Sequence, residues 1–465
     1  MVTWLTLNYN DESSEVSNAW RYHYATIYRA NWIIDNVTDN ANISAEVAKS
    51  VIAEAKFMRG YCYFNLTRWF DEVPIVLTSR TLDDLYPEKS SNEACWNQAI
   101  SDLEASLDGL PAPQANFVDG RGNTGVANAL LARLYLYRTR PGSSQYWDKV
   151  KQYTQAVENL SVYALEDMDD FSRIFTYTQE DTWVKNREVI WAIGFVYGPI
   201  YGGTPFIYAK QSNLGARTVM PVGKSPIKLL NDTGDPYLIG NGRTGQSRFA
   251  ANVELSDIMI NYHNLGDKRT SEYLWYPNYE DYALSNGNEP TSVYVKNVVN
   301  SDSLYRKAKE TNGSAGEYLH FKKYALREFV GTNIWDGGYN HPLMYPLIRF
   351  SDVLLMRAEA EYHLGDEATA KSYLKRITDR AGFDVTYTNS FSGQALVDEI
   401  LQQRRVELAF ESLRVPDLIR LDMFKPPHVG TYTGSVAWNE KLKVIPIPSR
   451  ELDNNSNLIQ NSLWK

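Results

Sequence analysis

The sequence predicts a mainly α-helical protein, a tetratricopeptide-like solenoid of helical hairpins with an inserted loop-rich subdomain that contains a few short strands. Apolar residues recur at helical spacing in the first third and the last quarter of the 465-residue chain. Between about residues 166 and 345 the composition shifts to Gly, Pro, Asn and Tyr. The chain is 43% hydrophobic and 22% charged, which suits a large globular core.

The first long helix is predicted from one apolar face. Its residues are spaced by three or four positions, and they are Val51, Ala55, Met58, Cys62, Leu66 and Trp69. The stretch from Asp71 to Pro74 ends this helix, because proline disfavours the α conformation of the residue before it. Further helices are expected at about 93–107, 124–137 and 146–160.

Three more helices are expected near the end, at about 351–364, 367–380 and 394–410. Consecutive helix pairs with short links are typical of stacked repeats, since one hairpin cannot bury its apolar face alone. A short strand is expected at 188–195, in a middle segment too long to be a single loop. We therefore predict a scaffold over 19–165, an insert over 166–345 and C-terminal repeats over 346–465, packed as one unit.

The stretch EILQQRRVELAFESLRVPDLIRLD from Glu399 predicts a helix rich in paired charges. Arg404 and Glu407 stand three positions apart and share a face with Leu401 and Leu408. The simplest interpretation is a solvated helix with surface ion pairs. On a partly buried face, the same charges would have to be paired and hydrogen-bonded.

Three other blocks accompany this one: AEAKFMRGYCYFNLTRWFDEVPIV (53–76), PLIRFSDVLLMRAEAEYHLG (346–365) and KVIPIPSRELDNNSNLIQN from Lys443. In this order the four blocks resemble the SusD/RagB family, nutrient-binding lipoproteins of the Bacteroidetes outer membrane. The resemblance spans roughly 19–464 and is weakest between 196 and 340. The paired charges match the family's motifs too, and we assign them to scaffold stability; they are Arg349, Glu359, Arg404, Glu407, Glu411 and Arg414.

The resemblance implies a non-catalytic protein without a cofactor, which binds glycans at the cell surface and delivers oligosaccharides to a SusC-like TonB-dependent transporter during polysaccharide utilization. One alternative keeps this partner and changes the cargo to peptides, as in the RagB branch. A generic helical-repeat adaptor is more distant. The main enzyme alternative is an α-toroid glycosidase, because the chain has many carboxylates and glycoside hydrolysis needs two of them.

The N-terminus carries no signal peptide and no lipobox cysteine before the helical part. Family members normally have both, so we expect a truncated chain or one that begins at an internal Met. On this interpretation the lipid anchor for membrane association is absent from this chain. The expected location, the outer membrane at the cell surface, follows from the resemblance alone.

Several function classes find no support in the sequence. The net charge is −9 without a long basic run, so nucleic acid is not an expected partner. Gly120, Gly122 and Gly125 match G-x-G-x-x-G but follow no buried strand, so we interpret them as turn residues beside a Thr124 helix cap. The six histidines show no zinc spacing, and we predict no metal site, although calcium held by loop carbonyls stays open. Cys62 is expected to be a small buried hydrophobe.

The aromatic content, with 12 Trp, 32 Tyr and 16 Phe, suits a sugar-binding surface. An exposed ring covers the C–H face of a sugar, and polar side chains bond its hydroxyls. The insert has two such clusters: Trp275, Tyr276, Tyr279 and Tyr282 beside Asn278 and Asp281, and Trp335 and Tyr339 beside Asn333, Asp336 and Asn340. The alternative is that these rings pin the insert to the helices.

The resemblance adds a second wall to this expected site. In similar proteins the segment after the VPIV block contributes to ligand contact, and here that segment is 80–86. Arg80 and Tyr86 are therefore ligand-binding candidates, together with Trp275, Tyr276, Tyr279, Trp335 and Tyr339. Trp69 and Trp191 fall in regular elements, and we expect them in the core.

Overall fold

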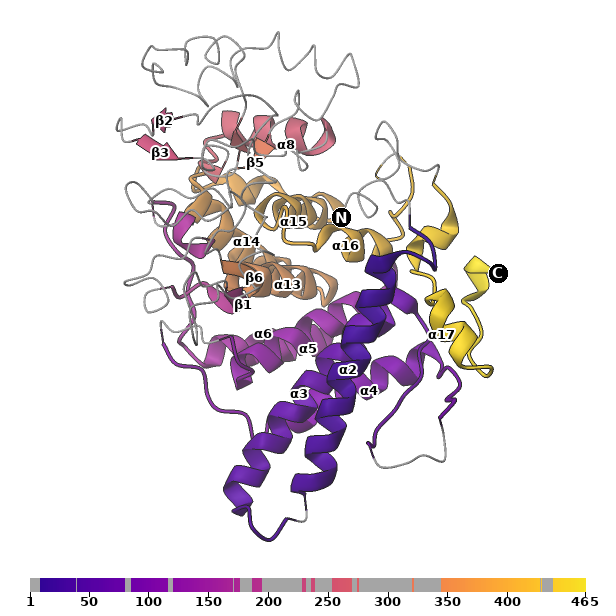
Figure 1. Cartoon of the computed structure of the whole chain (residues 1–465). Helices are drawn as coiled ribbons and strands as arrows, with labels where there is room; N and C mark the ends of the chain where they lie inside the picture. Colours follow the sequence, from indigo (N-terminus) through magenta and orange to yellow (C-terminus); the bar gives the residue numbers. More distant parts are fainter. Residues whose placement is uncertain are drawn as a thin grey trace. The chain divides into compact units, whose positions relative to one another are not determined.

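A computed structural model of the chain describes residues 9–38, 40–79, 85–115, 120–169, 171–175, 186–194, 228–230, 236–238, 253–269, 274–275, 320–321, 344–426, 428 and 438–465. The chain folds into two compact units. The first comprises Met1–Pro113, Arg121–Leu160 and Ser412–Lys465, and the second comprises Gln114–Gly120 and Ser161–Glu411. Each unit is helical at its centre (Figure 1).

The first unit is built from helical hairpins. Its helices are α2 (Ser14–Val37), α3 (Ala45–Phe70), α4 (Asn92–Ser106), α5 (Thr124–Arg138), α6 (Trp147–Asn159), α16 (Arg414–Arg420) and α17 (Ser449–Asn454), with the short 3-10 turns η6 (Glu440–Lys443) and η7 (Ser462–Trp464). Helix α3 packs against both α2 and α4, and α5 packs against α6 (Figure 1). The predicted fold of consecutive helical hairpins is confirmed here.

Local sequence explains where these helices start. Ser44, Ser91 and Asn123 each accept a hydrogen bond from the backbone N–H three residues later, which satisfies one of the free donors of the first turn. Helix α5 is buried on nearly every side, from Gly125 to Tyr137. It is therefore the core helix of this unit.

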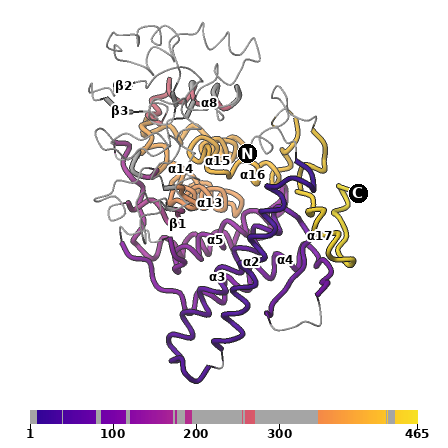
Figure 2. The backbone as a smooth tube through the Cα atoms, viewed as in Figure 1, coloured from indigo at the N-terminus to yellow at the C-terminus, as the bar shows by residue number. Residues whose placement is uncertain are grey.

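The C-terminal segment returns to the first helices. The backbone N–H of Ile445 donates to the carbonyl of Trp69 over 2.6 Å, and the Asn461 amide donates to the carbonyl of Phe70 over 3.0 Å. Near the start of α2, the N–H of Ser449 donates to the carbonyl of Asp11. The yellow end of the chain accordingly lies beside the indigo start of α2 (Figure 2).

The second unit combines helices with a short sheet. Its described elements are η1 (Phe171–Ile174), β1 (Val189–Gly194), β2 (Lys228–Leu230), β3 (Pro236–Leu238), α8 (Val253–Asn264), β4 (Leu274–Trp275), β5 (His320–Phe321), β6 (Met344–Arg349), α13 (Phe350–His363), α14 (Glu367–Ala381), η5 (Tyr387–Ser390) and α15 (Gln394–Glu407). Strands β1 and β6 are antiparallel, with Val189 opposite Arg349 and Gly194 opposite Met344. The predicted strand at 188–195 is thus confirmed as β1, while β6 was not foreseen.

Helices α13, α14 and α15 pack on one another in this unit. Helix α13 is buried along its whole first three turns, from Phe350 to Glu361. Helix α14 ends at Gly382, whose φ of 94° is the left-handed conformation that glycine adopts without a steric penalty. These bounds agree with the helices predicted at 351–364 and 367–380.

The predicted helix from Glu399 onward is wrong in its length. Helix α15 ends at Glu407, and α16 begins only at Arg414. Phe410 and Ser412, between them, have φ values of 66° and 62°, which a helix excludes. The helix ends here because the carbonyl of Glu407 accepts a hydrogen bond from the Arg349 side chain, at 2.8 Å, in place of a bond within the helix.

Two further expectations need correction. Trp69 is only partly buried, so it is not a core residue, whereas Trp191 is buried as expected. The interpretation of 399–422 as a solvated helix with surface ion pairs is also wrong, since Arg404, Glu407 and Arg420 are all buried. Cys62 is buried and carries a free thiol, as predicted.

The two units do not repeat the three predicted segments. Residues 412–465 belong with the N-terminal helices, so the predicted 346–465 segment is divided between the units. Most of the predicted insert over 166–345 lies outside the described residues. The packing of all three segments as one unit therefore stays a prediction.

Candidate functional site

Most of the predicted ligand-binding residues lie outside the described part of the chain. These are Arg80, Tyr276, Tyr279, Trp335 and Tyr339. Trp275 belongs to strand β4, where it pairs with His320 of β5. Tyr86 is described with its side chain, which is half exposed at 50%. The candidate site is therefore built outward from Tyr86 and the segment that leads to it.

The segment before residue 80 is fastened along α2 and α3 by buried or half-buried side chains. The Tyr63 hydroxyl accepts from the N–H of Val76 at 2.7 Å and donates to its carbonyl at 3.0 Å. The Asn31 amide donates to the same carbonyl at 2.9 Å, and the Tyr24 hydroxyl donates to the carbonyl of Pro74 at 2.8 Å. These bonds take the place of strand pairing and hold this segment against the two helices.

An ion pair between α3 and α4 supports these hydrogen bonds. Arg59 binds Asp102 in a bidentate manner, with Nε 2.8 Å from Oδ2 and Nη2 2.7 Å from Oδ1. Its Nη1 also donates to Oδ1 of Asn31 at 2.8 Å and, more weakly, to the carbonyl of Leu77 at 3.3 Å. A bidentate arginine–carboxylate pair is rigid as well as strong. It therefore fixes the guanidinium that binds Asn31 and orients the Asn31 amide toward Val76.

The entry and the exit of segment 80–85 are both held. At the entry, one oxygen of Asp35 accepts from the Thr78 hydroxyl, the Ser79 N–H and the Ser79 hydroxyl, all within 2.9 Å. At the exit, the Asn457 amide donates to the carbonyl of Tyr86 at 2.8 Å, and the Asn455 amide donates to that of Pro87 at 2.9 Å. Both asparagines belong to the LDNNSN block near the C-terminus.

Exposed apolar side chains flank this entry. Tyr28 and Trp32 are 57% and 54% exposed, and they lie one helical turn apart on α2. Asp35, which holds the entry, is three residues from Trp32 and thus on the same side of the helix. We call Tyr28, Trp32 and the exposed Leu77 the loop-entry patch. Sequence reasoning missed it, although aromatics at i and i+4 on a helix were a readable signal.

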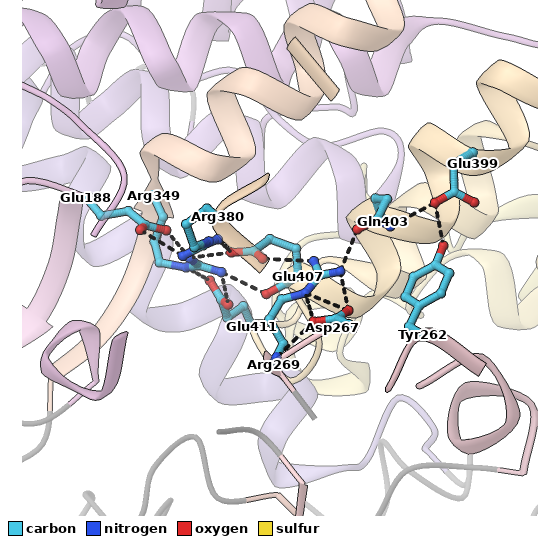
Figure 3. Close-up of polar contacts among 10 residues, drawn as sticks. All are labelled: Glu188, Tyr262, Asp267, Arg269, Arg349, Arg380, Glu399, Gln403, Glu407 and Glu411. Atoms are coloured by element: carbon cyan, nitrogen blue, oxygen red, sulfur yellow. Dashed lines mark hydrogen bonds and ion pairs between the residues drawn. The ribbon is translucent and has the colours of Figure 1, made fainter. Parts of the chain in front are cut away.

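A second polar cluster lies inside the second unit and is buried (Figure 3). Arg349, at the end of β6, contacts three carboxylates: Glu188, Glu407 at 3.0 Å and Glu411 at 2.8 Å. Burial alone would lower the pKa of Arg349, but these three carboxylates raise that pKa well above its ordinary value. The guanidinium therefore stays charged at the centre of the unit.

Two more arginines extend the cluster. Arg269, just after α8, bonds Asp267 at 2.6 Å, Gln403 at 2.6 Å and Glu407 at 3.1 Å. Arg380 of α14 bonds Glu407 at 2.6 Å and Glu188 at 3.3 Å. Three guanidinium groups thus share four carboxylates, which joins β1, β6, α8, α14 and α15 (Figure 3).

The carboxylate of Glu399 closes the network at its other end. Its Oε1 accepts from the hydroxyls of Tyr262 at 2.8 Å and Tyr387 at 2.9 Å, and from the Gln403 amide at 2.8 Å. Burial raises the pKa of Glu399, while these three donors partly oppose the rise.

The geometry supports a scaffold role for these charges. Each carboxylate around Arg349 is already bound to a guanidinium, so none is left as an acid–base pair facing solvent. Arg404 likewise pairs with the buried Asp352. Across the described ranges no cluster of His, Cys, Asp and Glu could hold a metal ion. None of the helices in those ranges combines the length and apolar character that a membrane crossing needs.

Comparison with known sequences places the chain in a family. A profile described as the SusD family matches residues 187–464, and one described as starch-binding associating with outer membrane matches residues 2–136. SusD-like protein P25 of Formosa agariphila is 24% identical over 465 residues, covering 97% of this chain and 79% of that protein.

Solved structures with the same fold give a consistent result. Surface glycan-binding protein A of Bacteroides uniformis has a TM-score of 0.68 at 21% identity, covering 100% of this chain and 88% of that one. A laminarin-binding SusD-like protein has a TM-score of 0.65 at 19% identity, covering 96% and 85%. At such identities the likeness establishes the fold. Because the family profile spans more than half of the sequence, the chain belongs to the SusD family.

Proposed function

We propose that this chain is a non-catalytic glycan-binding protein of the outer-membrane cell surface, which hands oligosaccharides to a SusC-like TonB-dependent transporter. Family membership supports the general role. Two structural neighbours are described as a surface glycan-binding protein and a laminarin-binding protein, which supports a glycan as cargo. The description of the second profile, associating with outer membrane, supports the location.

The observation that carries the proposal is that hydrogen bonds hold the chain at Ser79 and again at Tyr86, on either side of the predicted ligand segment, close to exposed aromatic rings. Trp32 and Tyr28 are exposed on α2, the helix whose Asp35 holds the entry, and the exposed Tyr86 marks the exit. Hydrogen bonds fix both ends before any ligand arrives, which lowers the entropy lost on binding. An exposed indole or phenol can cover the C–H face of a sugar, which suits a shallow, polar-edged site.

The proposed contacts comprise this patch and the residues predicted from the sequence. Trp32 and Tyr86 of the first unit would contact an oligosaccharide through their rings. Arg80 would bond sugar hydroxyls. The remaining members are the aromatic residues predicted from the sequence: Trp275, Tyr276, Tyr279, Trp335 and Tyr339.

Binding arrays of oligosaccharides and of peptides on the purified chain test the cargo. We expect oligosaccharide binding that weakens about tenfold in Trp32→Ala and in Tyr86→Ala, because each substitution removes a ring from the sugar face. Tyr22→Ala is the matched control, since Tyr22 is an exposed tyrosine on the same helix outside the patch. If the chain binds peptides and no oligosaccharide, its cargo is a peptide, as in the RagB branch. Unchanged oligosaccharide binding in both ring variants would refute this contact set.

Two further measurements test the remaining parts of the proposal. Affinity purification of the membrane-anchored protein from outer membranes should co-isolate a SusC-like barrel, and its absence under cross-linking would reject the transporter role. Long incubation of the purified chain with polysaccharide should release no reducing sugar. Release that persists in a highly purified sample would instead identify a glycosidase.

A further inference from the structure

A groove of about 620 Å³ lies on the hairpin helices of the first unit. It is formed by α4, α5 and the start of α6, and its lining residues are Glu93, Asn97, Ile100, Ser101, Glu104, Ala105, Tyr135, Arg138, Tyr146 and Lys149. The groove is shallow and wide open to solvent. Neither the proposed contact set nor the ion-pair network uses any of these side chains.

Tyr135 and Tyr146 line this groove, and the ring of Tyr153 packs against that of Tyr135. The ring of Tyr135 lies 5.7 Å from that of Tyr153, nearly parallel, and 5.7 Å from that of Tyr146. The Tyr153 hydroxyl donates to Oε1 of Glu104 at 2.5 Å, and that of Tyr135 reaches the same oxygen more loosely at 3.5 Å. Burial raises the pKa of Tyr135 to about 12, so this phenol stays protonated as a donor. The Glu104 carboxylate, which lines the groove, is therefore held in place.

Tyr146 has an unusual backbone. It precedes α6 with φ 72° and ψ −6°, the left-handed conformation that is a genuine outlier for a bulky side chain. Such strain persists only where the surroundings impose it, and it is concentrated at functional positions. Here it places the phenol ring in the groove, with the Arg138 guanidinium 4.5 Å from the ring centroid.

The polar lining defines the chemistry of a ligand. Glu93 and Glu104 oppose Arg138 and Lys149, so two negative and two positive charges leave the lining neutral. A strongly charged ligand would meet repulsion from one pair, whereas a neutral polyol can bond carboxylate, guanidinium and the Asn97 amide together. Tyr146 adds an aromatic surface beside these groups.

We propose that this groove is a second carbohydrate subsite, which takes a neutral sugar residue of the same glycan and rests on the proposed function. Tyr146 contacts the C–H face of the sugar, and Glu104 accepts hydrogen bonds from its hydroxyls. Arg138 and Asn97, which are joined by a hydrogen bond of 3.3 Å, contribute donors at the rim.

The test uses the full chain and neutral oligosaccharides cut from β-glucan, α-glucan, xylan and mannan. Tyr146→Gly removes the ring and also relieves the backbone strain, because glycine accepts φ 72° freely, so this variant keeps the fold. Glu104→Gln keeps the size of the side chain and removes its charge. Tyr22→Ala is again the control, as its ring carries a guanidinium at 4.7 Å, like that of Tyr146, but lies outside the groove.

Titration calorimetry should show about tenfold weaker binding of the preferred glycan in Tyr146→Gly, a smaller loss in Glu104→Gln and none in Tyr22→Ala. Hydrogen exchange should show slower exchange at residues 143–149 when that glycan is bound to the unmodified chain. Wild-type affinity in both groove variants, without this protection, would overturn the subsite and leave the proposed function standing. If the unmodified chain binds no glycan of any kind, the proposed function fails and the subsite fails with it.

Discussion

The Arg349 guanidinium binds both the side chain and the main chain of Glu407. Nη1 lies 3.0 Å from the carboxylate Oε1, and Nη2 lies 2.8 Å from the carbonyl oxygen. The two residues are the last of β6 and the last of α15. Arg349 therefore neutralises the buried Glu407 carboxylate. It also donates to the Glu407 carbonyl, which would accept a backbone hydrogen bond if the helix continued.

Substitution of Arg349 by Met should destabilise the second unit strongly. The change would leave Glu407 and Glu411 buried without this partner, and breaking a buried pair costs about 3–5 kcal/mol. Urea unfolding followed by circular dichroism would measure the loss. Lys375→Met is the matched control, because Lys375 pairs with Asp379 at the surface and such pairs contribute only about 0.3–0.5 kcal/mol. Equal losses in the two variants would contradict a structural role for the buried network.

Glu399 should make stability depend on pH. Burial raises its pKa in the folded state above the ordinary value of 4.5, so the folded chain binds this proton more tightly than the unfolded chain. The contribution of the protonated form is complete below pH 4.5 and is lost as the pH rises through the folded-state pKa. The difference in unfolding free energy between Glu399→Gln and the unmodified chain should therefore shift in favour of the variant as pH rises. A difference in unfolding free energy that stays constant from pH 4 to pH 8 would refute this contribution of Glu399.

Asn457 should act on ligand binding rather than on folding. Asn457→Asp removes the donor that holds the carbonyl of Tyr86 and places a carboxylate oxygen against it. We expect about fivefold weaker glycan binding, which corresponds to one hydrogen bond, and little change in melting temperature because the side chain is exposed. Asn389→Asp is the control, since that exposed side chain makes no hydrogen bond within the described residues. Equal affinities of the two variants would show that the hydrogen bond from Asn457 to the carbonyl of Tyr86 does not contribute to glycan binding.

Gly122 should not tolerate even a methyl group. A Cβ at this position would lie 2.6 Å from the Phe57 ring, so the ring or the turn before α5 must move. Gly122→Ala should cost about 1–3 kcal/mol in urea unfolding, as overpacking does. In a Phe57→Ala background the same substitution should cost much less, because the obstructing ring is gone. Equal costs in both backgrounds would place the cause in the backbone of Gly122 instead.

The glycines near residue 120 illustrate what a motif alone can say. Their spacing matches a dinucleotide-binding pattern, yet two of them have other structural reasons. Gly120 has φ 73°, and its carbonyl accepts from the indole of Trp191 at 3.0 Å, while Gly122 lies against Phe57. The missing strand before them was enough to reject the motif, but neither partner could be named from spacing.

The candidate site was predictable only in part. The four sequence blocks led to the family and to segment 80–86, where Tyr86 is half exposed and its role in ligand binding stays a prediction. Trp32 was missed because its exposure depends on how α2 packs against α3. The hydrogen bond from Asn457 to the carbonyl of Tyr86 was missed because the two residues are 371 positions apart in the chain.

The sequence by itself determined the helices, because apolar spacing, capping side chains and helix-ending Pro or Gly act within a few residues of one another. Only the tertiary structure decided where α15 ends, which charges are buried and which helices the last fifty residues join. Those outcomes depend on contacts between distant parts of the chain, such as Arg349 with Glu188 and Ile445 with Trp69. Side chains far apart in sequence can satisfy buried charges and backbone groups only after folding brings them together.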